Sequence, residues 1–367
     1  MKGNPADSEK IRFLWLDAAR GFAALAGMLY HFRDYLGVED VFRFGYVAVD
    51  LFFMMSGFVL AHAYGDKLQQ GMSIGRFLLV RLVRLYPGYV LSLLIGAAYY
   101  AAKIALRTDD APPLADMGAI MAQNLFFIPN SIDGVTPAGT FPFSPASWSL
   151  AMEMIASIAF GMVIWHLRQK VLVLLALLAG MIFFMFALRF GSIDIGFDLP
   201  HFGAGLFRCM FEFTVGVLLY RGAARWRARS VWLTPLLMLC AVVPMFVLAP
   251  SPWASAVLVV VVFPLFIILQ PQREPQGAIA LACVELGRIS YPLYLLHTPL
   301  FLWAAGVHKM LLGTDPATVV PWFGVGLSLF VIGFSWLSAR FFDEPVRKLL
   351  RAWIGRQSAV QARWSYG

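Results

Sequence analysis

Charged residues are scarce in this sequence: Asp, Glu, Lys and Arg make up 14% of its 367 residues, whereas 60% are hydrophobic. The mean hydropathy of +0.73 is far too high for an ordinary soluble domain. The composition therefore predicts an all-α polytopic membrane protein. A net charge of +8 does not indicate a nucleic-acid partner, because the basic residues lie in short connections between apolar stretches.

Cysteine is also rare, and its placement excludes two kinds of site. Cys209, Cys240 and Cys283 are scattered through apolar runs without a CxxC or a metal-like spacing. They predict neither a disulfide framework nor a zinc site, and we expect no metal. The sequence also lacks a nucleophile elbow and an activated-cysteine motif.

Long apolar stretches are abundant, and a bilayer needs about 20 apolar residues for each crossing. Basic residues gather in alternate connections and acidic residues in the others, which by the positive-inside rule predicts cytoplasmic N- and C-termini. In the longest outward connection, residues 107–144, a shorter apolar piece is interpreted as re-entrant or interfacial. The predicted bundle of about ten transmembrane helices occupies residues 14–36, 43–64, 78–104, 146–167, 171–190, 204–221, 231–249, 253–270, 289–312 and 318–341.

The first apolar stretch carries ionisable side chains, among them Asp17, Arg20 and His31. Such a group near the middle of a membrane helix costs about 2.5–3.5 kcal/mol by insertion scales, so it normally faces a bundle interior or a wet cavity. Arg20 and His31 are separated on a helix by three turns plus about 20° and a rise of about 16.5 Å. We expect them to line one polar passage. Alternatively, Arg20 pairs with Asp17 at one membrane surface while His31 marks the other.

Polar residues recur in the second stretch and at the entry to the third. Asp50 and Ser56 interrupt GYVAVDLFFMMSGFVLAHAY, where the glycine after Ser56 is interpreted as a close-packing residue. Arg81 and Arg84 lie one turn apart in RFLLVRLVRLYPGYVL, just before Tyr86. Two guanidinium groups on one face suit phosphate binding. An ordinary positive-inside anchor is the alternative.

The fourth and sixth stretches add further ionisable residues. The fourth opens with SPASWSLAMEMIASIAFG, which contains Trp148, Ser149 and Glu153. Glu153 is interpreted either as a partner that orients or deprotonates a histidine, or as a helix cap. In the sixth stretch, Arg208 and Glu212 are spaced i, i+4 and are interpreted as a structural ion pair.

The ninth stretch begins with GRISYPLYLLHTPLF, which places Tyr291, Tyr294 and His297 three residues apart. Tyr294 and His297, one helical turn apart, are expected to share a face. The last stretch ends in FFDEPVRKLL, where Glu344 belongs to an acidic pair that is followed by a proline and basic residues. This pattern is typical of a membrane exit.

Six of these motifs together resemble the acyltransferase 3 family of bacterial inner-membrane O-acyltransferases, which modify surface glycans, exopolysaccharides and some macrolides. The resemblance rests on LDAARG with the spacing from Arg20 to His31, and on VDLFFMMSGFVL, RLVRLYP, SWSLAMEM, GRISYPLYLLH and FFDEP, in family order. Ala18 and Ala19 stand where the family often has glycine and leucine, but every charged motif residue is present.

The resemblance is to the stand-alone form of the family, because the frequent C-terminal hydrolase-like domain has no counterpart in the sequence. It implies three parts: a cytoplasmic segment at residues 1–13, the acyltransferase 3 transmembrane domain at 14–348, and a basic cytoplasmic tail at 349–367.

The resemblance further implies an acyl-CoA donor in the cytoplasm, with acetyl-CoA expected, and an acceptor hydroxyl on the periplasmic side. The implied catalytic residues are His31 as general base, Glu153 to orient it and Arg20 in the passage. The implied donor-binding residues are Ser56, Arg81, Arg84 and Tyr86. The other motif residues are Asp17, Asp50, Trp148, Ser149, Arg208, Tyr291, Tyr294, His297 and Glu344.

The expected location is the bacterial cytoplasmic (inner) membrane. The expected partners are acyl-CoA, membrane lipid and a glycan, lipid-linked saccharide or small-molecule hydroxyl acceptor, with no nucleic acid and with a homo-oligomer left open. A transporter or flippase of a lipid-linked sugar, using the same charged passage without acyl chemistry, is the alternative function, and a non-catalytic scaffold is a third. Direct transfer is favoured over an acyl-histidine by the absence of a nucleophile motif.

Overall fold

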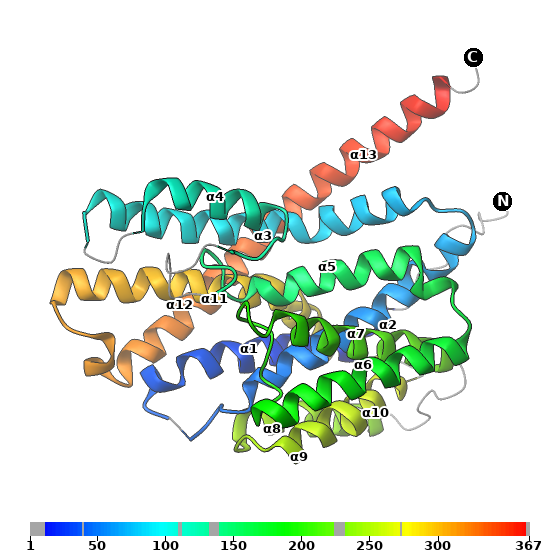
Figure 1. Cartoon of the computed structure of the whole chain (residues 1–367), viewed down its shortest axis with the longest axis horizontal. Helices are drawn as coiled ribbons and strands as arrows, with labels where there is room; N and C mark the ends of the chain where they lie inside the picture. The colour runs from blue at the N-terminus through cyan, green and yellow to red at the C-terminus, as the bar shows by residue number, and fades with distance from the viewer. Residues whose placement is uncertain are drawn as a thin grey trace.

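The computed structural model describes residues 12–38, 40–108, 112–131, 139–223, 232–271 and 274–364, with the side chains of the last helix described up to residue 354. It is a bundle of helices, most of which run along one common direction (Figure 1). The α-helices are α1 (Leu14–Leu36), α2 (Ala48–Gln69), α3 (Ile74–Ala105), α4 (Leu114–Leu125), α5 (Ser147–Met162), α6 (Gln169–Phe190), α7 (Phe202–Ala223), α8 (Leu233–Val247), α9 (Pro252–Val257), α10 (Phe263–Ile268), α11 (Gly277–Leu312), α12 (Trp322–Ser338) and α13 (Glu344–Trp364).

Short 3₁₀ and π segments connect several of these helices. The 3₁₀ turns are η1 (Gly45–Val47), η2 (Ile164–His166) and η4 (Pro316–Val319). The π-helical turns η3 (Leu258–Val262) and η5 (Ala339–Asp343) join α9 to α10 and α12 to α13 without a break.

Each of the ten predicted stretches contains a helix. In the described ranges, six helical segments are long and apolar enough to cross a membrane, and three further apolar helices are shorter, with 10–17 residues. The tenth is α1, whose 23 residues include the charged positions noted above. The prediction of an all-α, multi-pass membrane protein is confirmed, while the number of spans stays a prediction.

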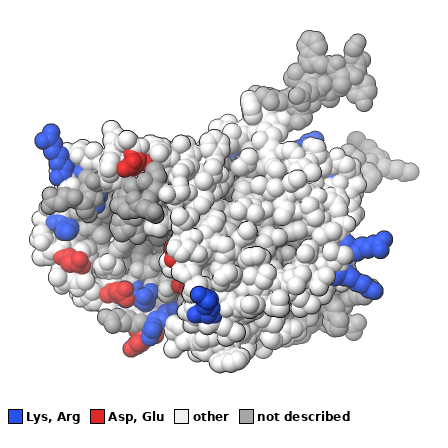
Figure 2. All heavy atoms as spheres, in the orientation of Figure 1, with Lys and Arg blue, Asp and Glu red and all other residues white. Residues whose placement is uncertain are grey.

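The outer surface of the bundle is apolar, as a lipid environment requires. Leu177 and Leu188 on α6 are 65% and 76% exposed, where a water-soluble helix would carry polar residues. Most of the face in Figure 2 is without charge. Its acidic side chains gather at the left, whereas the right-hand end shows only Lys and Arg. The positive-inside prediction depends on such a separation of basic from acidic residues between the two ends of the bundle.

Helix α5 starts inside the bundle rather than at its end (Figure 1). Residues 140–144, which precede it, are buried although they are not helical. A Cβ atom on Gly96 of α3 would lie 1.8 Å from the carbonyl oxygen of Phe143, so the two segments are in direct contact. Ser144 Oγ donates to the carbonyl oxygen of Leu295 at 3.4 Å, an oxygen that Pro299 leaves without an N–H donor in α11. Non-helical backbone at membrane depth is stable only when it is enclosed in this way.

The apolar piece in the connection 107–144 is α4, a 12-residue helix that packs on α3. Leu114 at its start is 71% exposed. A helix of this length is about 18 Å long and is too short to cross a bilayer, as predicted. Residues 109–111 and 132–138 of this connection lie outside the described ranges.

Helices α2 and α7 are in backbone contact at two glycines. A Cβ atom on Gly57 would lie 2.0 Å from the carbonyl oxygen of Phe213, and one on Gly216 would lie 2.0 Å from that of Met54. Small residues permit this close approach between membrane helices, so the packing interpretation of Gly57 is confirmed.

Helix α13 extends from the bundle toward the upper right of Figure 1. It runs through the predicted boundary between the membrane domain and the tail at residue 349 without interruption. The predicted N-terminal segment, residues 1–13, lies outside the described ranges except for its last two residues, as do the basic residues at 225, 227, 229 and 273.

Candidate active site

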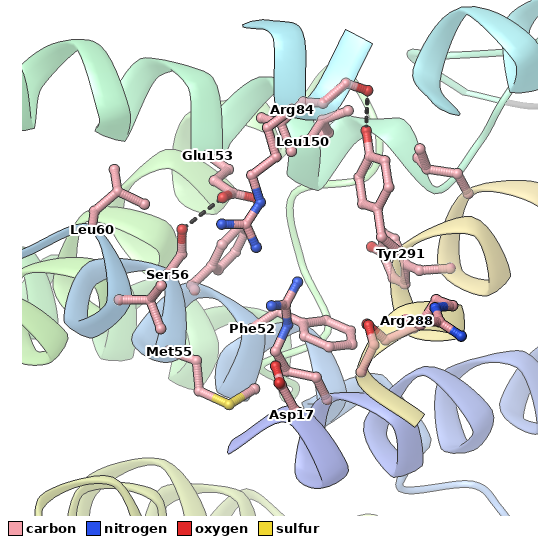
Figure 3. A pocket seen from close by; sticks show the side chains of 18 of the residues that line it. Asp17, Phe52, Met55, Ser56, Leu60, Arg84, Leu150, Glu153, Arg288 and Tyr291 are labelled. Atoms are coloured by element: carbon pink, nitrogen blue, oxygen red, sulfur yellow. Dashed lines mark hydrogen bonds between the residues drawn. The ribbon is translucent and has the colours of Figure 1, made fainter. Parts of the chain in front are cut away.

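A cavity of about 280 Å³ lies within the bundle, where α1, α2, α3, α5, α11 and α13 meet. Figure 3 shows Asp17, Ser56, Arg84, Glu153 and Tyr291 around it, each from a different helix. The lining contains six arginines and three acidic residues, so the cavity is cationic. These residues are Arg12, Arg20, Arg81, Arg84, Arg288, Arg347, Asp17, Glu153 and Glu344.

On one wall, Glu153 is held by two donors from neighbouring helices. Ser56 Oγ donates to Glu153 Oε1 at 2.6 Å, and Arg81 donates to the same oxygen at 2.5 Å. The Arg81 side chain is 2% exposed. Most of its charge is therefore compensated by Glu153, and Arg81 is less available for a ligand phosphate than the sequence predicted.

Two other arginines at the cavity have no such compensation. Among the described residues, Arg20 and Arg84 form no salt bridge or hydrogen bond through their guanidinium groups, and both are partly buried. The charged groups that act on Arg84 include Arg20 and Arg81, as well as Glu153. Partly buried cations without a partner are costly, and an anionic ligand would remove that cost.

Three other arginines that line the cavity form ion pairs. Arg12 Nε lies 2.6 Å from Asp17 Oδ2, and Arg288 Nε donates to Glu344 Oε1 at 2.7 Å. Arg347 pairs with Asp343. Asp17 therefore pairs with Arg12, and the alternative interpretation, in which Asp17 pairs with Arg20, is wrong.

Two tyrosines of α11 line the cavity on successive turns. The Tyr291 hydroxyl donates to the carbonyl oxygen of Leu85 on α3. The Tyr294 hydroxyl lies 2.7 Å from Ser149 Oγ on α5, and its ring lies edge-on to Phe52, with 5.4 Å between the ring centroids. Both tyrosines were predicted from the motif.

His31 is not among the residues that line this cavity. Its ring stacks on that of His297, with 5.1 Å between centroids and 28° between planes. His31 is exposed, whereas His297 is 1% exposed, and His297 in turn lies 6.1 Å from the ring of Tyr294. The rings of Tyr294 and His297 thus connect the cavity, which Arg20 lines, to the exposed His31. We expected Arg20 and His31 to line one continuous passage. Arg20 lines the cavity, but His31 does not.

The structure also corrects the predicted role of Glu153 toward His31. Glu153 contacts Arg81 and Ser56, whereas the rings next to His31 are those of Tyr30 and His297. His297 Nδ1 faces the carbonyl oxygen of Leu293 at 3.2 Å, and no described group lies within hydrogen-bond reach of its buried Nε2 atom.

Arg208 makes a bidentate pair with Asp50 across α2 and α7. Its Nε lies 2.9 Å from Oδ1 and its terminal nitrogen 2.5 Å from Oδ2, and both side chains are fully buried. The interpretation that Arg208 pairs with Glu212 is therefore wrong. Trp148 packs nearby, 5.9 Å from the Arg208 guanidinium, and neither Arg208 nor Trp148 lines the cavity.

Tyr86 was predicted to bind the donor, but it lies outside the cavity lining. Its hydroxyl donates to the carbonyl oxygen of Leu125 at 3.0 Å and so ties α3 to α4. Sequence reasoning missed the pair beside His31, in which Tyr30 donates to Asp194 at 2.9 Å. The position of Tyr30 directly before His31 was the available signal.

The fold and the cavity define an integral membrane protein with a cationic chamber that opens among six helices. A family model described as an acyltransferase domain matches residues 13–340. The chain is 40% identical over 175 residues to a Rhizobium radiobacter protein called "Protein 2 in picA locus", covering 44% of this chain and 89% of that protein. No solved structure matches the chain. The protein belongs to the acyltransferase 3 family, and the predicted resemblance is confirmed.

Proposed function

We propose that this membrane acyltransferase moves an acetyl group from acetyl-CoA to a hydroxyl group of a glycan or similar acceptor. The observation that carries the proposal is the pair of arginines without a salt bridge among the described residues, Arg20 and Arg84, at a cavity between the helices. CoA carries several phosphate charges, and guanidinium groups bind phosphate with directional, charge-assisted hydrogen bonds.

The volume of the cavity suits the diphosphate and the pantetheine arm of the donor rather than the whole molecule. About 280 Å³ is slightly below the range of about 300–1,000 Å³ that encloses whole ligands. The diphosphate would lie at Arg20 and Arg84, with the nucleotide outside. The pantetheine arm would then run past Ser56 toward Ser149 and Tyr294.

In the transfer step, His31 acts as general base on the acceptor hydroxyl. The acceptor oxygen attacks the thioester carbon, the carbon–sulfur bond breaks, and the proton accepted by His31 passes to the sulfur of CoA. The exposure of His31 supports an acceptor that arrives from outside the bundle. Glu153 keeps Arg81 and Ser56 in place and does not touch the histidine.

The proposed location is the bacterial cytoplasmic membrane, with both termini and the donor in the cytosol. The end of the bundle where only Lys and Arg are visible in Figure 2 supports this orientation. The acceptor would then be modified on the periplasmic side, which suits an exopolysaccharide or another surface glycan.

Two measurements test the proposal. Calorimetric titration of the full-length protein in lipid nanodiscs with acetyl-CoA should give saturable binding that is weakened in Arg84→Ala. Arg76→Ala, an exposed arginine of the same helix outside the cavity lining, should bind as the wild type does. Absence of binding by the wild type would remove the donor assignment.

The second measurement identifies the acceptor and the chemistry. Surface glycans from cells that lack the gene are compared by mass spectrometry with those from cells that carry the wild type or His31→Asn. Only the wild type should add the mass of an acetyl group. A transporter using the same cavity would move a glycan without adding this mass, and would release no CoA.

A further inference from the structure

A row of rings leads from the cavity to His31, and it starts at Tyr294. This residue lines the cavity on one side and lies 6.1 Å from His297 on the other, and His297 stacks on the exposed His31. Tyr294 therefore belongs to the donor pocket, whereas His297 and the proposed base lie beyond its lining. An acyl group that moves from the cavity to His31 along this row of rings has to pass Tyr294.

Tyr294 is held in place by contacts from two other helices, α5 and α2. Its hydroxyl lies 2.7 Å from Ser149 Oγ, at the buried start of α5. Ser149 Oγ donates its own proton to the carbonyl oxygen of Ala146 at 3.1 Å, so it accepts from Tyr294 because a serine hydroxyl has one proton. Phe52 of α2 packs edge-on against the Tyr294 ring.

The helix that carries Tyr294 is continuous but has a proline on each side of this residue. Pro292 and Pro299 lie inside α11, and each removes one helical hydrogen bond. One of the freed oxygens, that of Leu295, accepts from Ser144 at 3.4 Å. The segment around Tyr294 thus has fewer backbone bonds to break than an uninterrupted helix when its side chain moves.

We propose that Tyr294, through its hydrogen bond to Ser149, is the gate that closes the inner end of the donor cavity. The inference rests on the proposed function, because the gate keeps water from a thioester bound in the cavity. Without closure, water attacks the acyl carbon, the carbon–sulfur bond breaks, a water proton goes to sulfur, and the products are acetic acid and CoA. The gate is a positioning element and takes no part in bond making.

The test is the hydrolysis of acetyl-CoA in the absence of any acceptor, by full-length protein in nanodiscs. CoA is quantified by chromatography, because Cys240 is exposed and would react with a thiol reagent. Tyr294→Phe and Ser149→Ala each remove the same hydrogen bond. Each should raise hydrolysis about fivefold, which corresponds to a hydrogen bond of about 1 kcal/mol.

A double variant and a matched control distinguish loss of the gate from a general loosening of the helix packing. Tyr294→Phe combined with Ser149→Ala should hydrolyse acetyl-CoA no faster than either single variant, since they share one interaction. Tyr89→Phe loses a comparable bond, from its hydroxyl to the Asn124 carbonyl oxygen, outside the cavity lining. It should hydrolyse acetyl-CoA at the wild-type rate.

The possible failures are distinguishable. If the wild type binds acetyl-CoA but neither single variant raises hydrolysis, or if Tyr89→Phe raises it equally, the gate is refuted and the donor assignment stands. If the wild type binds no acetyl-CoA, the proposed function is refuted, and the gate with it. A gain of hydrolysis cannot come from misfolding, because an unfolded protein loses the donor site.

Discussion

Arg81 and Arg84 lie one turn apart on α3 and line the same cavity, yet their replacement by alanine should have different consequences. Arg81→Ala leaves the Glu153 carboxylate without its partner. Loss of one member of a buried pair costs about 3–5 kcal/mol. Because the Glu153 side chain is 22% exposed to the cavity, we expect the lower end, about 3 kcal/mol, which in a domain of this size lowers Tm on the order of 5 °C.

Arg84→Ala removes a cation that forms no salt bridge among the described residues; Arg20 and Arg81 repel it, while Glu153 and Asp343 attract it without direct contact. Its Tm should be equal to or above that of the wild type. Its affinity for acetyl-CoA should fall about ten- to a hundredfold, because a hydrogen bond to a charged group contributes about 1.5–3 kcal/mol.

The assay is a thermal melt of both variants in one detergent, with and without acetyl-CoA, together with calorimetric titration. Arg81→Ala combined with Glu153→Gln should recover most of the lost Tm, since no unpaired charge is left. Equal losses of Tm in the two single variants would refute the division of roles between them. So would an unchanged affinity for acetyl-CoA in Arg84→Ala.

Three further predictions concern residues outside the cavity. Arg208→Met should lower the free energy of unfolding by about 3–5 kcal/mol, because Asp50 is fully buried, and Asp50→Leu in the same chain should restore Tm in a thermal melt. His297→Gln removes the ring that stacks on His31. It should lower kcat for acetyl transfer in steady-state assays and leave KM for acetyl-CoA unchanged, because His297 does not line the donor cavity. Burial raises the pKa of Asp194 despite the opposing effect of Arg208, so Tm should fall as the pH rises through that pKa, and Asp194→Asn should weaken this dependence.

The fold class and the set of charged motifs could be predicted from the sequence because both depend on local patterns. Apolar runs of bilayer length mark helices wherever they occur, and Arg20, Arg84 and Glu153 are conspicuous because charge is rare among such residues. The pairing of these charges depends on helix packing, which local spacing does not determine. Arg208 had an acid one turn away but binds Asp50, from a helix more than a hundred residues earlier.

The same limit applies to Arg81 and Arg84. The two arginines have equivalent positions in the sequence motif. Only the position of α5 places the Glu153 carboxylate against Arg81 and not against Arg84. The depth at which α5 begins depends in turn on the close contact between Gly96 and the carbonyl oxygen of Phe143. Nothing in the sequence of α3 alone indicates this contact.

The reciprocal glycine contacts between α2 and α7 have a consequence for motion during turnover. With Gly57 and Gly216 each against a carbonyl oxygen of the other helix, and with a fully buried ion pair beside them, these two helices can neither slide nor separate without losing both. The wall that carries Ser56 is therefore stationary. Any rearrangement that admits an acyl group must come from the opposite side, so crosslinks between α2 and α7 should be tolerated during catalysis, whereas crosslinks that pin α11 should stop it.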